Sequence, residues 1–221
     1  MELILDTADT QAIKELNELL CIQGVTTNPT IITKSGKPFD EVVKEIIAIL
    51  KENQKLFIQV VSTTCDEMVE EARYICSLRP KNMVVKIPVT NEGYKAIKKC
   101  KALGLEVLAT AIYTSQQAFL AALSGADYLA PYVNRMDNYG DGVLDVIDLL
   151  AMLKNANMKT KVIAASFKNT QQVHSLLVAG IQAITLPVDV VKNMMNHPGS
   201  EIAVSEFSKN WEDAYNIKKL R

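Results

Sequence analysis

Residues 83–103, MVVKIPVTNEGYKAIKKCKAL, join a short apolar run to a longer stretch with helical periodicity. The run 83–89 is rich in β-branched residues and predicts a buried strand, while 92–103 places its apolar residues at the spacing of one helix face. A strand that is apolar on both faces is typical of a parallel sheet covered by helices.

The same strand and helix unit recurs along the whole chain. Strands are predicted at 3–6, 24–27, 56–61, 83–89, 106–111, 128–133, 161–167 and 183–187, and helices at 10–20, 39–51, 66–78, 92–103, 115–123, 143–153, 170–178 and 188–196. Eight such units in 221 residues predict an α/β fold, a compact (β/α)8 TIM barrel. An open doubly wound sheet is the alternative, but the even spacing and the lack of Gly-x-Gly-x-x-Gly after the first strand favour the barrel.

An additional C-terminal helix is predicted over about residues 200–217, after the eighth unit. Apolar side chains recur there at roughly helical spacing, at Ile202, Val204, Phe207, Trp211 and Tyr215. This apolar stripe could pack on the barrel or on a neighbouring subunit. Because no linker divides the chain, we expect one barrel domain over residues 1–221 that includes this helix.

Composition argues against several classes of function. The 24 basic and 25 acidic residues leave a net charge of −1 without long blocks of like charge, so neither nucleic acid nor a membrane surface is an expected partner. The N-terminus lacks a secretory pattern and no apolar run is long enough to span a bilayer, so we expect a soluble cytoplasmic protein. Four separated cysteines and two histidines show no metal-ligand spacing, which predicts reduced thiols and no metal site.

Lys86 lies in the middle of the apolar run 83–89. Burial penalises a charged ammonium and lowers the pKa of a lysine, which leaves a neutral amine able to attack a carbonyl and form a Schiff base. Lys86 is therefore the leading candidate nucleophile. An edge strand whose lysine reaches out to water is the structural alternative.

Polar residues also occur near the ends of the other predicted strands. They are Asp6, Thr26, Thr27, Asn28, Gln59, Thr110, Tyr132, Asn134, Arg135, Ser166 and Lys168. Each alone could be a helix cap, a turn residue or a surface charge. In a barrel, however, the carboxyl ends of the strands form the active site, so these side chains would converge on Lys86.

Such a cluster would suit imine chemistry. Asp6 and Tyr132 are titratable groups that could move protons, and Thr110 or Gln59 could hold a water between them. The iminium is itself the electron sink, so no metal or organic cofactor is required. Arg135, Ser166 and Lys168 offer a guanidinium, a hydroxyl and an ammonium that suit a phosphate group.

Five motifs identify a resemblance to the small transaldolase family. They are LDTA (5–8), GVTTNPT (24–30), VVKIPVT (84–90), APYVNR (130–135) and AASFK (164–168). The likeness runs from the first strand to the final helix, and is greatest to the fructose-6-phosphate aldolases. Transaldolases carry a glutamate where this chain has Gln59, and usually a phenylalanine where it has Tyr132. The segment TAIY at 110–113 also resembles the fructose-6-phosphate aldolases.

The resemblance implies a class I aldolase that cleaves fructose 6-phosphate to dihydroxyacetone and glyceraldehyde 3-phosphate and runs the reverse addition. It implies that Lys86 forms the Schiff base, Tyr132 is the acid/base group, and Gln59 and Thr110 hold the catalytic water. The remaining assignments it implies are Asp6 and Asn28 for the dihydroxyacetone hydroxyls, and Arg135, Ser166 and Lys168 for the phosphate. It also implies a pentamer or decamer assembled through the C-terminal helix.

Two other functions stay open. A transaldolase would pass the three-carbon unit from sedoheptulose 7-phosphate or fructose 6-phosphate to an aldose phosphate in the pentose phosphate pathway, using the same lysine. A non-catalytic sugar-phosphate binding protein would keep Arg135, Ser166 and Lys168 but would have no use for a buried lysine.

Overall fold

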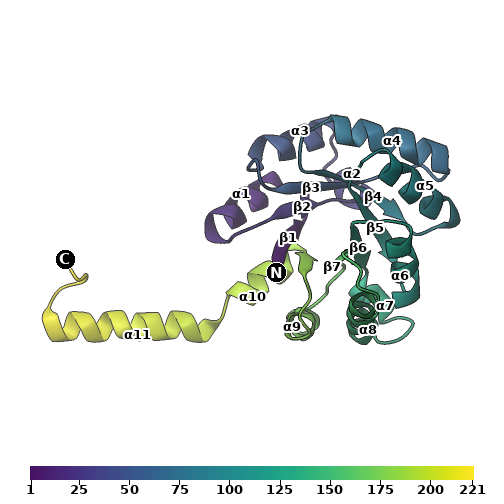
Figure 1. Ribbon diagram of the computed structural model, residues 1–221. Coiled ribbons are helices and arrows are strands. Elements are labelled where there is room, and N and C mark those ends of the chain that lie inside the picture. The colour runs from purple at the N-terminus through teal and green to yellow at the C-terminus, as the bar shows by residue number, and fades with distance from the viewer.

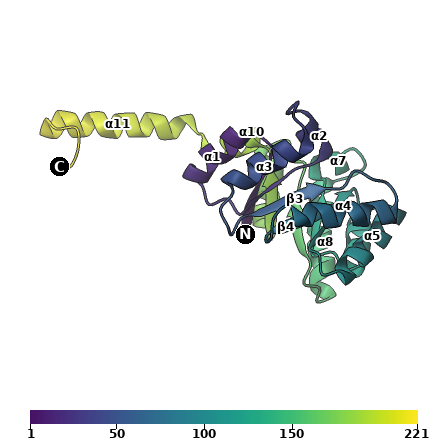
Figure 2. The same cartoon turned by 90° about the horizontal axis from the view of Figure 1, so that it is seen from above.

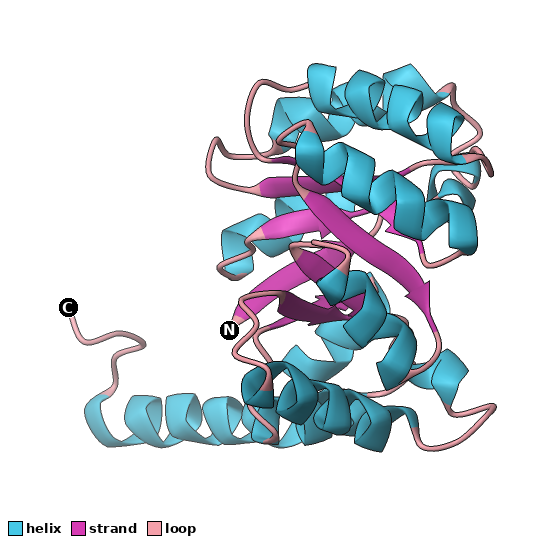
Figure 3. Cartoon of the chain, turned by 45° about the vertical axis from the view of Figure 1, so that its right-hand side comes forward, coloured by secondary structure: helices cyan, strands magenta, loops and turns pink.

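The computed structural model describes all 221 residues and contains a closed barrel of eight parallel strands (Figure 3). The strands are β1 (Glu2–Asp6), β2 (Gly24–Thr26), β3 (Lys55–Gln59), β4 (Met83–Pro88), β5 (Val107–Ile112), β6 (Tyr128–Pro131), β7 (Lys161–Ala164) and β8 (Ala183–Leu186). Each pairs with its neighbour in sequence, and β1 also pairs with β8. The predicted TIM barrel is therefore confirmed, and the open sheet is not formed.

Helices follow every strand. They are α1 (Thr10–Leu19), α2 (Pro29–Thr33), α3 (Phe39–Ile49), α4 (Cys65–Ser77), α5 (Asn91–Ala102), α6 (Ser115–Leu123), α7 (Val133–Met136), α8 (Gly142–Asn155), α9 (Thr170–Val178), α10 (Val188–Met195) and α11 (Pro198–Tyr215). The sequence patterns missed α2 and α7, which are too short to show a period. The predicted strands at 128–133 and 161–167 were too long, because β6 ends at Pro131 and β7 at Ala164.

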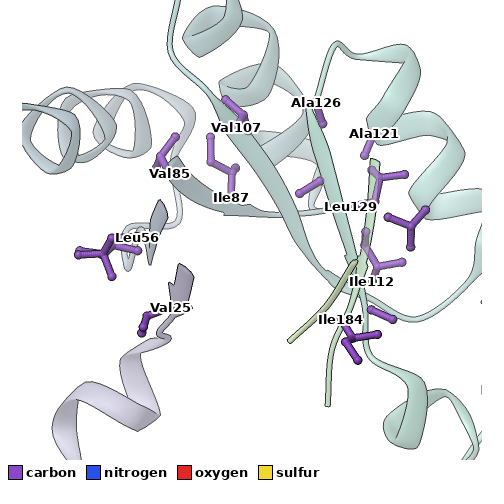
Figure 4. Packing of buried hydrophobic residues seen from close by; sticks show 14 of the residues in the cluster. Val25, Leu56, Val85, Ile87, Val107, Ile112, Ala121, Ala126, Leu129 and Ile184 are labelled. Carbon is purple, nitrogen blue, oxygen red and sulfur yellow. The ribbon is translucent and has the colours of Figure 1, made fainter. Parts of the chain in front are cut away.

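Two separate apolar clusters hold the barrel together. The larger contains 46 buried residues between the outside of the sheet and the surrounding helices, and Figure 4 shows part of it, including Val85, Ile87 and Leu129. The smaller has nine buried residues inside the barrel, among them Phe57 and Val84. Both faces of the strands are thus covered, as the continuous apolar runs predicted.

The end of β4 is fixed by close packing of α5. The hydroxyl of Thr90 caps this helix by accepting a hydrogen bond of 3.0 Å from the Gly93 nitrogen. A Cβ atom on Gly93 would lie only 1.8 Å from the carbonyl oxygen of Pro88. Glycine is therefore required for α5 to reach the backbone that follows Lys86.

The C-terminal helix α11 extends away from the barrel (Figures 1 and 2). None of its residues is buried, and Phe207 is 68% exposed. The sequence allowed α11 to pack on its own barrel or on a neighbouring subunit, and it does not pack on its own barrel. No helix of this chain has both the length and the apolar character that crossing a bilayer requires.

Candidate active site

A polar layer lies on the apolar interior of the barrel, towards the carboxyl ends of the strands. Side chains two residues apart on a strand share a face, so the apolar interior residues Ile4, Phe57, Val84, Leu108 and Ala130 predict which positions point inward next. Those positions are Asp6, Gln59, Lys86, Thr110 and Tyr132, each from a different strand or strand end. The barrel thus brings together five residues that the sequence had singled out.

Lys86 is the buried amine of this layer. Only 4% of its surface is exposed, and its Nζ donates a 2.7 Å hydrogen bond to the carbonyl oxygen of Thr27. Burial lowers the pKa of Lys86, and the negative charge of Asp6 opposes this effect in part. A carbonyl oxygen can accept from a neutral amine as well as from an ammonium, so the contact with Thr27 is compatible with the neutral form.

Asp6 belongs to a short chain of hydrogen bonds across β1, β2 and β8. The Thr26 hydroxyl donates to the Asp6 carboxylate at 2.7 Å, and the Thr26 and Thr185 hydroxyl oxygens are 2.6 Å apart. Because Thr26 has a single hydroxyl proton, Thr185 must be the donor in the second bond. The chain fixes one oxygen of Asp6 and leaves the other for a ligand or a proton.

Tyr132 lies on the opposite side of the layer. Its hydroxyl oxygen is 3.0 Å from that of Thr110. Burial raises the pKa of Tyr132, although the Thr110 hydrogen bond and the nearby positive charge of Arg135 lower it to a smaller extent. The phenol therefore stays protonated at neutral pH and can donate a proton.

A backbone irregularity shapes the strand end beside Tyr132. The register between β5 and β6 shifts between Ala109 and Ile112, and Ala111 has a left-handed φ of 55°. A positive φ is uncommon for a residue with a Cβ atom, and such strain often marks functional sites. Thr110 points into the barrel by the regular alternation of β5, and the strained Ala111 follows it directly.

Gln59 is paired in register with Lys86 on the adjacent strand. Its Oε1 is buried and has no hydrogen-bond partner. Gln59 also lines a cavity of about 570 Å³ beside the ends of β3 and β4, and it is the only residue of the polar layer that does so. Because buried amide oxygens normally have a partner, Oε1 is available to accept from a substrate or a water.

Two of the expected binding residues use their side chains elsewhere. The Thr27 hydroxyl donates to the Phe57 carbonyl at 3.3 Å, so this residue meets Lys86 through its backbone. The Asn28 Oδ1 accepts from the Ile31 nitrogen at 3.0 Å and caps α2. The Asn28 cap has a local signal, since Thr-Asn-Pro is typical of a helix start, whereas the bond from Thr27 to Phe57 on β3 is a tertiary contact that the local sequence does not show.

The last expected group comes from α7 and from the segment after β7. The Asn134 nitrogen donates to the Ser166 carbonyl at 3.1 Å, which ties the two segments together, and Ser166 also has a left-handed φ, of 61°. Arg135 and Lys168 are exposed. The guanidinium of Arg135 lies 4.7 Å from the centre of the Tyr132 ring, so this cation is tied to the polar layer.

Comparison with known families assigns the chain to one of them. The sequence matches the family described as Transaldolase/Fructose-6-phosphate aldolase over residues 3–220. The chain belongs to this family. Transaldolases and fructose-6-phosphate aldolases are Schiff-base enzymes of the class I aldolase type, and the resemblance stated from the motifs is confirmed.

Solved structures of flavocytochrome b2 share only the fold with this transaldolase/aldolase family member. A doubly substituted flavocytochrome b2 with sulfite bound is 11% identical to this chain, with a TM-score of 0.58. The matched region covers 85% of this chain and 56% of the flavocytochrome chain. A singly substituted one with benzoylformate is 10% identical with a TM-score of 0.60, and the coverage is 85% and 57%. The present chain thus spans little more than half their length.

Sequence reasoning missed two polar residues of this site. Thr185 follows Ala183 at the spacing of one strand face, and that alternation was a signal that could have identified it. Tyr113 lies just beyond the bulge of β5, and its ring centre is 5.9 Å from that of Tyr132. No local pattern points Tyr113 towards the site, because the bulge sets its direction.

Replacing Lys86 by methionine should stabilise the barrel and abolish imine formation. Burial lowers the pKa of Lys86 in the folded chain, so the unfolded chain binds an extra proton between that pKa and about 10.4. The stability of the wild type therefore rises with pH across that window. The gain in melting temperature from Lys86→Met should be largest near neutral pH and smaller near about pH 10.

Thermal unfolding of both proteins at several pH values measures this difference. Lys154→Met is the matched control, since Lys154 is exposed and forms no salt bridge, and it should leave the melting temperature unchanged at every pH. A Lys86→Met variant that melts below the wild type near neutral pH would show that burial of the Lys86 amine does not destabilise the fold.

Proposed function

We propose that this chain is a class I aldolase that cleaves fructose 6-phosphate to dihydroxyacetone and glyceraldehyde 3-phosphate and catalyses the reverse addition. The observation that carries the proposal is the Lys86 amine, buried in a polar layer that also holds the Thr110 and Tyr132 hydroxyl pair. This arrangement supplies a nucleophile and a proton donor, which are the groups that imine chemistry needs.

In the proposed reaction the neutral amine of Lys86 attacks the C2 carbonyl of the ketose. The carbinolamine takes up a proton and loses water to give an iminium. The C3–C4 bond then breaks: its electron pair flows into the iminium to form an enamine, and the C4 hydroxyl proton passes to a base. Glyceraldehyde 3-phosphate leaves. Protonation of the enamine at C3 and addition of water then release dihydroxyacetone and regenerate Lys86.

The other residues of the layer would serve these steps. Tyr132 stays protonated and suits the proton transfers, with Thr110 and the free Gln59 oxygen holding the water. Asp6, held by Thr26, would bind the dihydroxyacetone hydroxyls together with Asn28. In this proposal the phosphate lies at the mouth, where Asn134, Arg135, Ser166 and Lys168 are close in the chain or bonded to one another. The Thr27 carbonyl would orient the Lys86 nitrogen.

The choice between cleavage and transfer depends on the fate of the enamine. A transaldolase makes the same enamine and lets an aldose phosphate capture it, whereas an aldolase protonates and releases it. Gln59 is uncharged and lies next to Lys86, and Tyr132 carries a hydroxyl that phenylalanine would lack. Both features favour protonation and therefore release of dihydroxyacetone.

Product analysis with fructose 6-phosphate and erythrose 4-phosphate tests the proposal. The wild type should release more free dihydroxyacetone than it transfers to the aldehyde. The double variant Gln59→Glu with Tyr132→Phe should shift the products towards transfer. We expect release to fall by about 10²-fold or more, since one positioned acid or base contributes at least that much to such steps.

Lys86→Ala is the control for this assay, and it should form neither product. Transfer that exceeds release in the wild type would contradict the aldolase assignment and favour a transaldolase. No turnover of either kind, with intact binding of the sugar phosphate, would favour a binding protein.

We also propose that the chain assembles as a homo-oligomer, a pentamer or decamer, through α11. On this helix Val204, Phe207, Trp211 and Tyr215 follow one another at intervals of three or four residues and so share one face. Phe207 and Tyr215 are 68% and 63% exposed, and the helix does not pack on its own barrel. An exposed apolar stripe of this kind is typical of an interface.

Phe207→Ser should reduce the assembly to smaller species, because it places a hydroxyl at the centre of the apolar face. Sedimentation velocity of the full chain measures the change in mass. Lys209→Ser, on the opposite face of the same helix, is the control and should leave the mass unchanged. An unchanged mass for Phe207→Ser, or a monomeric wild type, would contradict assembly through this face.

A further inference from the structure

Tyr113 has no part in the mechanism above, yet it contacts two residues that do. It follows β5 directly and is partly buried. Its backbone nitrogen donates to the side chain of Gln117 at 2.9 Å, which anchors the residue to the first turns of α6. The backbone that carries the Tyr113 ring is thus held in place at the mouth of the barrel.

Tyr113, Tyr132 and Arg135 form a closed triangle of contacts. The rings of the two tyrosines meet edge to face, with their planes at 69°. The Arg135 guanidinium lies over the face of Tyr132, and its Nη1 donates to the Tyr113 hydroxyl at 3.4 Å. Each member therefore restrains the other two.

The restraint matters most for Arg135. No carboxylate is paired with this exposed cation, and α7 is only four residues long. A free arginine samples many rotamers, and a ligand that fixes it must offset the lost entropy. An arginine that already has one planar contact and one hydrogen bond loses less when it binds an anion.

We propose that Tyr113 is a positioning residue that holds the Arg135 guanidinium against Tyr132, oriented to bind the phosphate of the aldehyde substrate. The inference rests on the proposed function and deepens it. In it, the Tyr113 hydroxyl helps the enzyme to prefer phosphorylated over unphosphorylated aldehydes, although this hydroxyl contacts neither substrate. Tyr113 acts only through Arg135 and is not a catalytic residue.

Aldol addition of dihydroxyacetone to two acceptors tests this role. With Tyr113→Phe, the KM for glyceraldehyde 3-phosphate should rise about three- to tenfold, the range expected when one ordinary hydrogen bond is lost, because the contact between Arg135 and Tyr113 is long and exposed. The KM for glyceraldehyde and both kcat values should stay unchanged, since the aromatic packing is retained. A merely structural role would instead affect both acceptors alike.

Two further variants sharpen the experiment. Tyr139 also packs edge to face on Tyr113 but is 81% exposed and has no bond to Arg135, so Tyr139→Phe should change neither KM. In an Arg135→Ala background, Tyr113→Phe should have no further effect on the KM for glyceraldehyde 3-phosphate, because two residues that act as one unit are not additive.

The inference is overturned if Tyr113→Phe leaves the KM for glyceraldehyde 3-phosphate unchanged. It is also overturned if both acceptors respond equally, or if the effect persists in the Arg135→Ala background. A wild type that adds dihydroxyacetone to neither acceptor would instead contradict the proposed function, and the two failures are thereby distinguished.

Discussion

The loss of water around the Lys86 amine is the constraint on which the rest of the site depends. Exposure of only 4% disfavours the ammonium, lowers the pKa of the lysine and makes the nitrogen a nucleophile in the proposed reaction. Its only hydrogen-bond partner is a backbone carbonyl, and the Asp6 charge acts against the shift without removing it. The polar layer therefore costs stability, and the two apolar clusters of the barrel must offset that cost.

The alternation of side chains along each strand separates the polar layer from the apolar clusters. On β4, Val85 and Ile87 pack outward against the helices, Val84 fills the lower interior, and Lys86 points into the layer above it. The same alternation carries Asp6, Gln59 and Thr110 to the same layer from other strands. Ala111 and Ser166 both have a left-handed backbone, and they shape the two chain segments that flank Tyr132.

This alternation also explains what the sequence could predict. The strands and the inward direction of Lys86 follow from short-range patterns, and the family follows from motifs in order. Thr185 was missed although its position has the same signal, whereas Tyr113 could not be found because a bulge turns it towards the site. The use of the Thr27 carbonyl in place of its hydroxyl depends on a tertiary contact with Phe57 that no local pattern records. The apolar stripe of α11 was visible in the sequence, but it could not show that this helix leaves its own barrel.

Reduction with borohydride in the presence of dihydroxyacetone, followed by mass analysis of the peptides, tests the central claim most directly. An imine on a neutral buried amine should form near neutral pH and be trapped on the peptide that contains Lys86. An amine in water is mostly an ammonium near neutral pH and does not attack carbonyls, so peptides that lack Lys86 should remain unmodified. No mass increase on the Lys86 peptide, or trapping confined to surface lysines, would contradict the account of a buried amine as the nucleophile.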